Sequence, residues 1–453
     1  MTITIVGAGL AGCEAALVLA RGGLSVRLLE QNPIQRTPAQ VSDAPAELVC
    51  SNSLRSNNPL NAVGLIKEEL DHLQSPLLAL AREHAVPAGD ALAVDREGFA
   101  HGVRMALKEE PLIEQRAEVV TDWGPGPEPW ILATGPLTAE GLAGRIQQEV
   151  GERLAFYDAI APIVEADSLD RNIIYAMSRY GKGDGADYLN IPLTQSEYLA
   201  FLEAVLAADR VQAHDFEDLK YFEGCLPLEV MAQRGVETLR YGPMKPVGLP
   251  DPRTGRDPYA VIQLRAENQA GTSYNMVGFQ TRMKWGDQRR IFQSLPGMGE
   301  ARFLRLGVVH RNTYVDAPRC LDDRMALKGQ PHVHLAGQIT GCEGYVESLS
   351  VGHLLAQLLL CDGAGTPWIC PPETTALGAL WGHLRGAHKA PGAAHEPNNI
   401  HWGLFPPLEG RWKKAERKAR RLDRARQDFQ AWLEATGRSI VSGGSQGTLR
   451  RIS

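Results

Sequence analysis

Apolar and polar positions in the first thirty residues predict a strand, a glycine-rich turn, a helix and a second strand. Residues 3–6 form a short apolar run that is typical of a buried strand. The helix expected next carries small apolar residues on one side, and Gly22-Gly23 ends it. Residues 24–30 (LSVRLLE) predict the second strand, which ends in Glu30. This order is typical of the start of an α/β domain.

Two later segments repeat the pattern of a buried strand that stops at a glycine. Residues 128–137 (EPWILATGPL) predict a strand that ends at Thr134-Gly135. Residues 332–360 predict a strand, a glycine turn and a long helix. Because strands alternate with helices, we expect a parallel sheet with crossover connections.

The stretch from 160 to 309 has a different character and is richer in Tyr, Pro, Asp and Arg. Its strand-like pieces, YAVIQLRAE and YNMVGFQTRMKW, lie close together, as in an antiparallel sheet. We expect an inserted α+β domain at 160–309. It would separate a first part of the nucleotide-binding domain (1–159) from a second part (310–407).

The chain becomes basic near its C-terminus, with nine Lys or Arg against two Asp or Glu between residues 411 and 426. Apolar residues keep helical spacing through this stretch, from Trp412 to Leu433. The residues after Arg438 are rich in Gly and Ser. We expect residues 408–453 to form a basic helix and a loose tail.

Composition excludes several classes of protein. The 453 residues are 44% apolar and 22% charged, and a net charge of -6 means that any nucleic-acid site has to be a local basic patch. Seven cysteines without CxxC or Cys/His spacing predict free thiols in a reducing cytoplasm and no metal site. The start MTITIVGAG and the lack of an apolar run of about 18 residues predict neither a signal peptide nor a membrane span.

The first turn carries the spacing GxGxxG, at Gly7, Gly9 and Gly12, and Glu30 follows 18 residues after the last glycine. This context predicts a dinucleotide site. The first glycine permits the turn, the second lets the pyrophosphate approach, and the third lets the helix pack on the strand. The helix N-terminus, with Ala8, Leu10 and Ala11, offers amide donors to the phosphates. The alternative is a glycine-rich turn without a ligand.

Three features favour FAD over NAD as the dinucleotide. The motif lies within the first dozen residues, an ATG sequence ends the strand near residue 135, and a strand–glycine–helix element comes late. That late element would close over the flavin with Gly337 and Gln338. A second GxGxxG for a nicotinamide cofactor is missing, because YGKGDGADY has no flanking buried strand. We therefore expect a Rossmann-type FAD-binding domain of the glutathione-reductase type.

Two cysteines stand in unusual surroundings. Cys50 lies in LVCSNSLRSN, which has the pattern of neither a helix nor a strand, and Cys225 lies in YFEGCLPLE. Cys342, in ITGCEGY, could approach a flavin or could pack in the core. Taken alone, each cysteine is more often structural than catalytic, because a reactive thiol needs access and nearby cations.

A series of segments carries a family resemblance over residues 5 to 411. In chain order these are GAGLAGCEAA, ELVCSNSLRSN, PAGDALAVDREGF, ILATGPLT, YDAIAPIV, FEGCLPLE, GPMKPVGLPDPRTG, MVGFQTRMKWGDQRRIF, HRNTY, GCEGYVESLSVG, PPETTALGAL and HWGLFPPLEGR. The chain resembles the folate/FAD-dependent tRNA (uracil-54-C5)-methyltransferases, the TrmFO family of the MnmG (GidA) superfamily.

The resemblance implies methylation of C5 of uridine 54 in the tRNA T-loop. Methylenetetrahydrofolate would supply the carbon, reduced FAD the electrons, and NAD(P)H would reduce the FAD. It also implies two catalytic cysteines, which fall on Cys225 and Cys50. A thiolate that adds at C6 makes C5 nucleophilic, and a second group has to remove the C5 proton. We assign Cys225 as the nucleophile and Cys50 as its assistant, with the reverse assignment open. Tyr345 is a candidate wall of the folate pocket, or a core residue.

Two basic patches are candidates for RNA contact. The first, in RMKWGDQRR, consists of Arg282, Lys284, Trp285, Arg289 and Arg290, and the second begins at Lys413 and Lys414. The alternative for both is a solvated surface. Two other functions stay open: the same chemistry on a ribosomal RNA uridine, and a non-catalytic flavoprotein that binds RNA. The oligomeric state is also open, with a monomer favoured.

Overall fold

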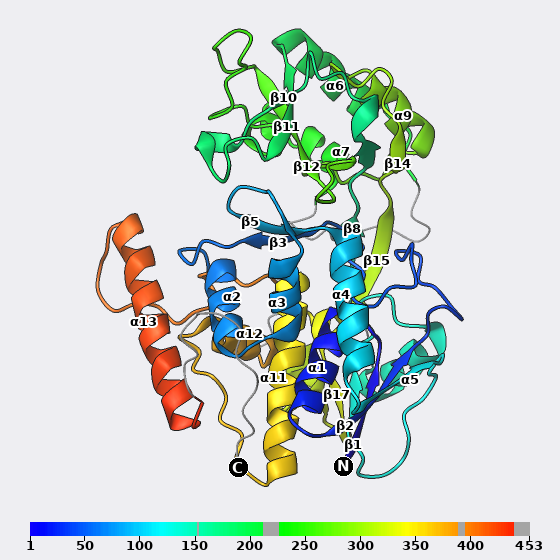
Figure 1. Cartoon of the computed structure of the whole chain (residues 1–453), viewed down its shortest axis with the longest axis vertical. Coiled ribbons are helices and arrows are strands. Elements are labelled where there is room, and N and C mark those ends of the chain that lie inside the picture. Colours follow the sequence, from blue (N-terminus) through cyan, green and yellow to red (C-terminus); the bar gives the residue numbers. More distant parts are fainter. Residues whose placement is uncertain (152–153, 212–225, 388–394, 439–453) are drawn as a thin grey trace.

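The computed structural model describes residues 1–151, 154–211, 226–387 and 395–438, and these form two packed parts. Figure 1 shows the first part below, with the N-terminus, and the second part above it. Each part has its own hydrophobic core. The first core draws on residues from 3 to 150 and from 315 to 433, and the second draws on residues from 164 to 301.

The first part is built on a six-stranded sheet in the order β16-β17-β7-β1-β2-β6. All neighbours are parallel except β16 and β17. The strands are β1 (Thr2–Val6), β2 (Ser25–Glu30), β6 (Ile113–Ala117), β7 (Trp130–Leu132), β16 (Ala326–Leu327) and β17 (Gln330–Leu335). The predicted parallel sheet is therefore present, and the late strand β17 lies beside β7, as crossover connections require.

Helices pack around this sheet. They are α1 (Leu10–Arg21), α2 (Ala62–His72), α3 (Pro76–Glu83), α4 (Arg96–Glu109), α5 (Glu140–Val150), α10 (Ala317–Cys320), η4 (Gly337–Thr340), α11 (Tyr345–Ala364) and α12 (Ala376–Leu384). The early helix α1 and the late helix α11 cross closely. A Cβ on Gly352 would lie 2.3 Å from the carbonyl oxygen of Ala11. The late helix is thereby held beside the first glycine turn.

A small sheet in the order β3-β5-β4 lies at the junction of the two parts. It consists of β3 (Ser53–Ser56), β4 (Ala85–Val86) and β5 (Ala91–Val94). The expectation that LVCSNSLRSN contains no strand is wrong for its second half. Arg55 has a φ of 62°, and the register between β3 and β5 shifts there, so the sequence lacks the regular alternation of a strand.

The second part is a six-stranded antiparallel sheet with helices. The sheet order is β10-β11-β12-β13-β9-β14. Its strands are β9 (Ile163–Glu165), β10 (Tyr175–Ala176), β11 (Tyr188–Leu193), β12 (Ala260–Ala266), β13 (Ser273–Met276) and β14 (Phe303–Arg305). Its helices are η1 (Ala166–Ser168), η2 (Arg179–Gly181), α6 (Gln195–Ala207), α7 (Leu228–Gln233), α8 (Thr238–Tyr241) and α9 (Trp285–Gln293).

The strand expected over YNMVGFQTRMKW is shorter than predicted. β13 ends at Met276, and Gly278 follows with a φ of 78°, which a β ladder does not accept. Trp285 then begins α9. The pairing of β12 with β13 is antiparallel, as expected.

Two strands connect the parts. β8 (Leu154–Ala159) and β15 (Val309–Tyr314) pair antiparallel with each other and run between the two sheets (Figure 1). β8 ends at Ala159 and β15 begins at Val309. We keep the domain boundaries at 159 and 309 as a proposal.

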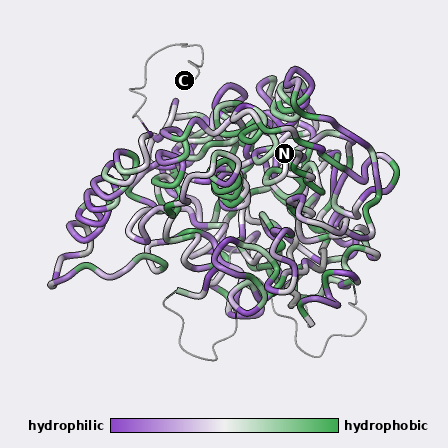
Figure 2. Tube along the Cα trace, turned by 90° about the horizontal axis from the view of Figure 1, so that it is seen from below, coloured by the Kyte–Doolittle hydropathy of each residue, from purple (hydrophilic) through white to green (hydrophobic). Residues whose placement is uncertain are grey.

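The basic C-terminal helix is α13 (Lys414–Ala435), on the outside of the first part. Leu422, Phe429 and Leu433 are buried against the core, while Ala419 is exposed. Figure 2 shows mostly hydrophilic residues along this helix, in contrast to the hydrophobic interior. The predicted tail after residue 438 lies outside the described residues.

Candidate active site

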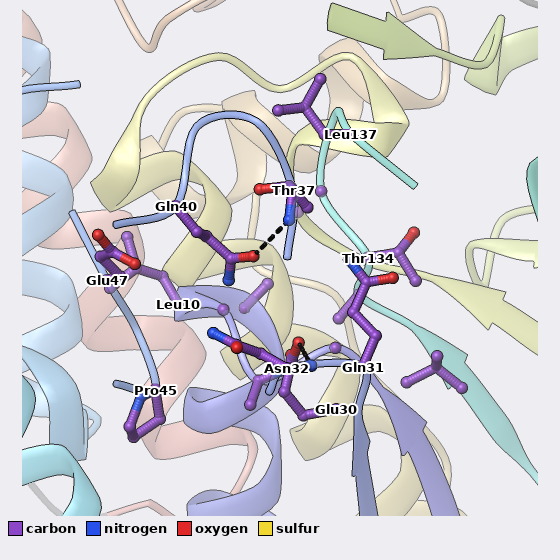
Figure 3. A pocket seen from close by; sticks show the side chains of 18 of the residues that line it. Leu10, Glu30, Gln31, Asn32, Thr37, Gln40, Pro45, Glu47, Thr134 and Leu137 are labelled. Carbon is purple, nitrogen blue, oxygen red and sulfur yellow. Dashed lines mark hydrogen bonds between the residues drawn. The ribbon is translucent and has the colours of Figure 1, made fainter. Parts of the chain in front are cut away.

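A cavity of about 430 Å³ opens where β1, β2 and β7 end, beside the N-terminus of α1. This is the edge at which parallel α/β sheets bind ligands. Figure 3 shows Leu10, Glu30 and Thr134 around it. Nine of the predicted cofactor residues line the cavity: Gly7, Ala8, Gly9, Leu10, Ala11, Glu30, Gly337, Gln338 and Tyr345.

The three glycines of the first turn have separate structural reasons. Gly7 has a φ of 101°, which residues with a side chain rarely adopt. Gly12 does not line the cavity, because it faces the turn, and a Cβ there would lie 1.9 Å from the carbonyl oxygen of Gly7. A Cβ on Gly9 would meet no protein atom within 4 Å. Gly9 therefore keeps space free for a ligand, and no side chain caps the amides that follow it in α1.

Glu30 braces this turn. Its Oε2 accepts a hydrogen bond from the amide of Ala8 at 2.6 Å, and its Oε1 accepts one from the amide of Asn32 at 3.0 Å. Each carboxylate oxygen has a second lone pair. The side chain can therefore hold the turn and still accept a bond from a ribose hydroxyl.

The late element closes the cavity from the other side. Gly337 has a φ of 77°, and a Cβ there would lie 2.9 Å from the Cβ of Ala11, so the backbone of η4 sits against α1. The Gln338 amide donates to the carboxylate of Glu343 at 2.7 Å. Tyr345 is the first residue of α11 and lines the same cavity.

Tyr345 connects Cys50 to the cavity. Its hydroxyl oxygen accepts hydrogen bonds from the amides of Cys50, at 2.8 Å, and Ser51, at 3.1 Å. Burial raises the pKa of Tyr345, and a nearby Cys50 charge raises it further, so the phenol stays protonated at neutral pH. The backbone of the half-buried Cys50 is thus bonded to a residue that lines the cavity. Tyr345 both lines the cavity and supports this loop, and its contact with folate stays a prediction.

Charged side chains fix the strand that follows Cys50. Arg55 forms an ion pair with the buried Glu347 of α11 at 2.9 Å. The ammonium of Lys67 donates to the carbonyls of Leu54 and Arg55, at 2.9 Å each. Burial, together with the nearby charges of Arg82 and Arg55, lowers the pKa of Lys67 to about 7. This network holds β3 against α2 and α11.

Cys225 lies outside the described residues, but the residues after it are anchored. The amide of Leu228 donates to the carbonyl of Gln280 at 2.7 Å. The buried carboxylate of Glu229 accepts from the Thr281 hydroxyl and the Arg282 amide, both at 2.9 Å. Leu228 and Glu229, which follow Cys225 in the sequence, are thereby tied to the loop before α9.

The remaining cysteines divide by burial. Cys13 and Cys342 are fully buried. Burial raises the pKa of both thiols, that of Cys342 to about 12, and Cys342 does not line the cavity. Cys342 is therefore a packing residue. Burial also raises the pKa of Cys370, to about 12, and the pKa of Cys320, which ends the short helix α10 rather than lying in a loop.

The basic patch at α9 is partly neutralised. Arg282 pairs with buried Glu229, Lys284 with Asp209 at 3.2 Å, and Arg290 with Asp287 at 2.6 Å. Arg289 is exposed and forms no ion pair within the described part of the chain. Trp285 is 60% exposed at the start of the helix, one turn before Arg289. Trp285 and Arg289 are therefore the exposed part of the patch that no ion pair engages within the described residues.

The basic patch at α13 lies on the other side of the molecule (Figure 1). Lys413 is exposed, and Lys414 is the first residue of the helix. Arg420 pairs with Glu416 and stacks on Trp412, with its guanidinium carbon 3.6 Å from the ring centre. The two patches therefore cannot contact the same short stretch of RNA.

Neither a membrane span nor a metal cluster is found in the ranges that the structure describes. No helix there is long and apolar enough to cross a membrane. No group of three or more His, Cys, Asp or Glu side chains there could hold a metal ion.

Comparison with known proteins identifies the family of this chain. The family model "Glucose inhibited division protein A" (GIDA) matches residues 2–362. A relative from Anaeromyxobacter sp. (strain Fw109-5), named methylenetetrahydrofolate–tRNA-(uracil-5-)-methyltransferase TrmFO, is 55% identical and covers 95% of this chain and 96% of its own. A TrmFO of Myxococcus xanthus (strain DK1622) is 53% identical over 96% of this chain and 95% of its own. The chain belongs to the TrmFO family.

Solved structures support the fold of this TrmFO-family chain. Aquifex aeolicus GidA, in its form II crystal, superposes with a TM-score of 0.67 at 13% identity. The match covers 95% of this chain and 73% of that one. The predicted Rossmann-type α/β fold and the predicted family are both confirmed.

Sequence reasoning missed much of the cavity wall. The TrmFO-family chain also lines it with residues Thr37, Gln40, Asp43, Glu47 and Val49, with Arg104, with Gln115 to Glu118, and with Leu137 to Ala139. The loop between 31 and 49 carries no motif, and β6 reaches the cavity only through its place at the edge of the sheet. The ATGPLT segment is a signal for part of this wall in the sequence, where it predicts a strand end and favours FAD.

Proposed function

We propose that this chain catalyses the methylenetetrahydrofolate- and FAD-dependent methylation of C5 of uridine 54 in the tRNA T-loop. Membership of the TrmFO family supports the reaction class. The geometric observation that carries the proposal is the bond between the Cys50 loop and Tyr345, because Tyr345 also lines the dinucleotide cavity. The loop that carries Cys50 and the cofactor cavity thus share the side chain of Tyr345.

The cavity fits FAD. The open space over Gly9, the uncapped amides of α1 and the carboxylate of Glu30 match a pyrophosphate and a ribose. When bound and reduced, FAD supplies the electrons that turn the transferred one-carbon unit into a methyl group. Gly337, Gln338 and Tyr345 would face its other end. NAD(P)H as the reductant is part of the proposal.

The two cysteines would act on the uracil ring. The Cys225 thiolate forms a bond to C6, which moves electrons to C5 and lets C5 bond to the one-carbon unit carried by folate. Cys50 takes the proton from C5. Loss of this proton breaks the bond between the one-carbon unit and the folate nitrogen, so tetrahydrofolate leaves and a methylene stays on C5. A hydride equivalent, which bound reduced FAD would supply, would turn this methylene into a methyl group while the bond from Cys225 to C6 breaks, which restores the C5–C6 double bond and the thiolate. The reverse assignment of the cysteines predicts the same product.

RNA would contact the chain at the two basic patches. Trp285 and Arg289 offer a ring and a free cation, which suits a base and its phosphate. α13 offers a second charged surface. The target base has to turn out of the T-loop to reach the cavity, at a cost of a few kcal/mol. A cytoplasmic, monomeric enzyme remains our expectation.

The test uses the full chain with bound FAD, a tRNA transcript, methylenetetrahydrofolate and NADPH. Mass spectrometry should map 5-methyluridine to position 54, and a transcript with cytidine at 54 should gain no methyl group. Methylation of ribosomal RNA alone would move the substrate to the rRNA alternative. FAD binding without methylation of either RNA would contradict the proposal.

A second experiment assigns the cysteines. Cys225→Ala should abolish the covalent complex with RNA that contains 5-fluorouracil, whereas Cys50→Ala should still form it. Cys361→Ser, in a half-buried position on α11, is the matched control and should behave like the unchanged protein. A complex that persists in Cys225→Ala and disappears in Cys50→Ala would reverse our assignment.

A further inference from the structure

Three arginines from three different elements surround the Cys50 loop. Arg96 begins α4, Arg265 lies in β12 and Arg305 ends β14. Two of them, Arg265 and Arg305, therefore reach the loop from the second part of the molecule. A charge on Cys50 acts on the pKa of all three guanidinium groups.

Arg265 makes the most specific contacts. Its Nε donates to Asn52 Oδ1 at 2.8 Å, and its Nη2 donates to the Ser51 hydroxyl at 3.0 Å. The Asn52 amide is fully buried and donates to the carbonyls of Val94, at 2.9 Å, and Ala266, at 2.8 Å. The two residues after Cys50 are thus bonded to both parts of the molecule.

Arg305 and Arg96 hold the residues before Cys50. Arg305 donates to the carbonyl of Val49 at 2.9 Å and to that of Ala39 at 3.2 Å. Arg96 donates to the carbonyl of Leu48 and forms an ion pair with Glu267. The backbone from Leu48 to Asn52 is therefore fixed on both sides of the thiol.

The charges around Cys50 are predominantly positive. Glu267 pairs with Arg96, but no carboxylate in the described ranges forms an ion pair with Arg265, which is 7% exposed. Burial lowers the pKa of Arg265, and negative charge on Tyr188, Glu267 and Cys50 opposes this effect. A buried cation without a carboxylate partner is costly, so a protein keeps one where it has an anion to stabilise.

The other ionisable groups near the loop have further partners: the charge of Glu47 acts on the pKa of Arg305, and Tyr188, whose pKa burial raises, donates to the carbonyl of Ala88. Glu47 accepts hydrogen bonds from the amides of Val41, at 3.0 Å, and Ser42, at 3.3 Å. Tyr345 is a protonated phenol, and Arg55 points to Glu347. The Cys50 thiol belongs to the loop that these three arginines hold through Leu48, Val49, Ser51 and Asn52.

We propose that Arg265 and Arg305 are positioning residues for Cys50. They hold its loop against Tyr345, and they stabilise the thiolate that the proposed function uses as a base. The inference rests on that function for the role of Cys50. Proton removal from C5 by Cys50, in the first part of the molecule, then requires the charges of Arg265 and Arg305 from the second part.

The test measures alkylation of Cys50 by iodoacetamide as a function of pH, in the full chain with bound FAD and without RNA or folate. Peptide mass spectrometry follows Cys50 separately from the other cysteines. The pH midpoint of the rate reports the thiolate fraction, whereas the limiting rate at high pH reports access to the thiol. Neither quantity depends on methyltransferase activity, so this test can fail independently of the proposed function.

Arg265→Gln should move the midpoint to higher pH and make alkylation below it about tenfold slower, because a nearby cation favours an ionised group by roughly this factor or more. Arg302→Gln is the matched control. It removes the same charge from the same part of the molecule, where Arg302 is exposed and pairs with Glu165 and Asp167. Its midpoint should stay unchanged.

Two further variants test the proposal if Arg265→Gln fails to fold. Arg305→Gln changes a half-buried side chain and should also raise the midpoint. Arg265→Lys should keep the midpoint, because it retains the charge. It should reduce kcat, because lysine cannot make the two-point contact with Asn52 and Ser51. Midpoints in Arg265→Gln and Arg305→Gln that equal that of Arg302→Gln, with FAD bound, would overturn the proposal.

Discussion

Replacing Gly9 by alanine should weaken FAD binding and leave the fold intact. Gly9 has a φ of -77° and a ψ of -174°, which alanine adopts freely. The new Cβ would meet no protein atom within 4 Å, and Gly9 lines the cavity. The methyl group would therefore occupy space that belongs to the ligand.

The magnitude follows from the contact that is lost. A hydrogen bond from an amide to a charged phosphate contributes about 1.5–3 kcal/mol. Loss of one such bond weakens FAD binding by roughly 10- to 150-fold. The free energy of unfolding of the FAD-free protein should change by less than about 0.5 kcal/mol, because no packed contact is altered.

Gly12→Ala is the matched contrast. Its Cβ would lie 1.9 Å from the carbonyl oxygen of Gly7. The backbone fixes the position of both atoms, so no side-chain rotation relieves the clash. Overpacking of this kind costs about 1–3 kcal/mol. This variant should lose stability without FAD as well as FAD affinity.

The assay has two readouts. Flavin absorbance gives the FAD content of each purified variant, and titration of the FAD-free protein gives Kd; urea unfolding of the FAD-free protein gives stability. Unchanged FAD affinity in Gly9→Ala would mean that the dinucleotide does not approach this turn. A loss of FAD-free stability equal to that of Gly12→Ala would mean that Gly9 is a structural residue.

Three further predictions concern other elements. Burial lowers the pKa of Lys67 to about 7, so between about pH 7 and 10 the unfolded chain binds a proton that the folded chain lacks. The free energy of unfolding, measured by urea unfolding at several pH values, should therefore rise with pH in this window. The rise should be absent in Lys67→Met. Equal slopes of unfolding free energy against pH in the two proteins would contradict this prediction. Glu69→Ala removes an acceptor for two amides at the start of α12. It should lower the free energy of unfolding in urea by about 2–4 kcal/mol without loss of FAD. A decrease below about 0.5 kcal/mol would refute the capping role of Glu69. Trp285→Ala should weaken tRNA binding by about 1–3 kcal/mol in filter binding, while the equally exposed Leu304→Ala should not; equal effects would exclude stacking at α9.

The first strand, turn, helix and strand could be predicted because each depends on neighbours in the sequence. The apolar run of β1, the conformation of Gly7 and the close contact of Gly12 are all local. The same holds for the late strand and helix. Family resemblance added the two cysteine segments, which pattern alone left ambiguous.

The rest of the site depends on contacts that no local pattern encodes. The cavity wall from Gln115 to Glu118 exists because β6 pairs with β2 at the edge of the sheet. β3 was missed because Arg55 interrupts its alternation. Arg265 lies more than two hundred residues after Ser51 and Asn52, and only the packing of the two parts brings them together.

The two halves of the site therefore differ in what supports them. The dinucleotide cavity is built within the first part, from the turn at Gly7 to the start of α11. The Cys50 loop is held by Arg96 and Tyr345 of that part and also from outside it, by Arg265 and Arg305. Gly9→Ala should then weaken FAD binding without moving the alkylation midpoint of Cys50, and Arg265→Gln should move the midpoint without weakening FAD binding. Because Gly9 lies in the first turn while Arg265 bonds to Ser51 and Asn52, the two effects should add in the double variant. A strongly non-additive result would mean that bound FAD itself orders the Cys50 loop, through the contact of both with Tyr345.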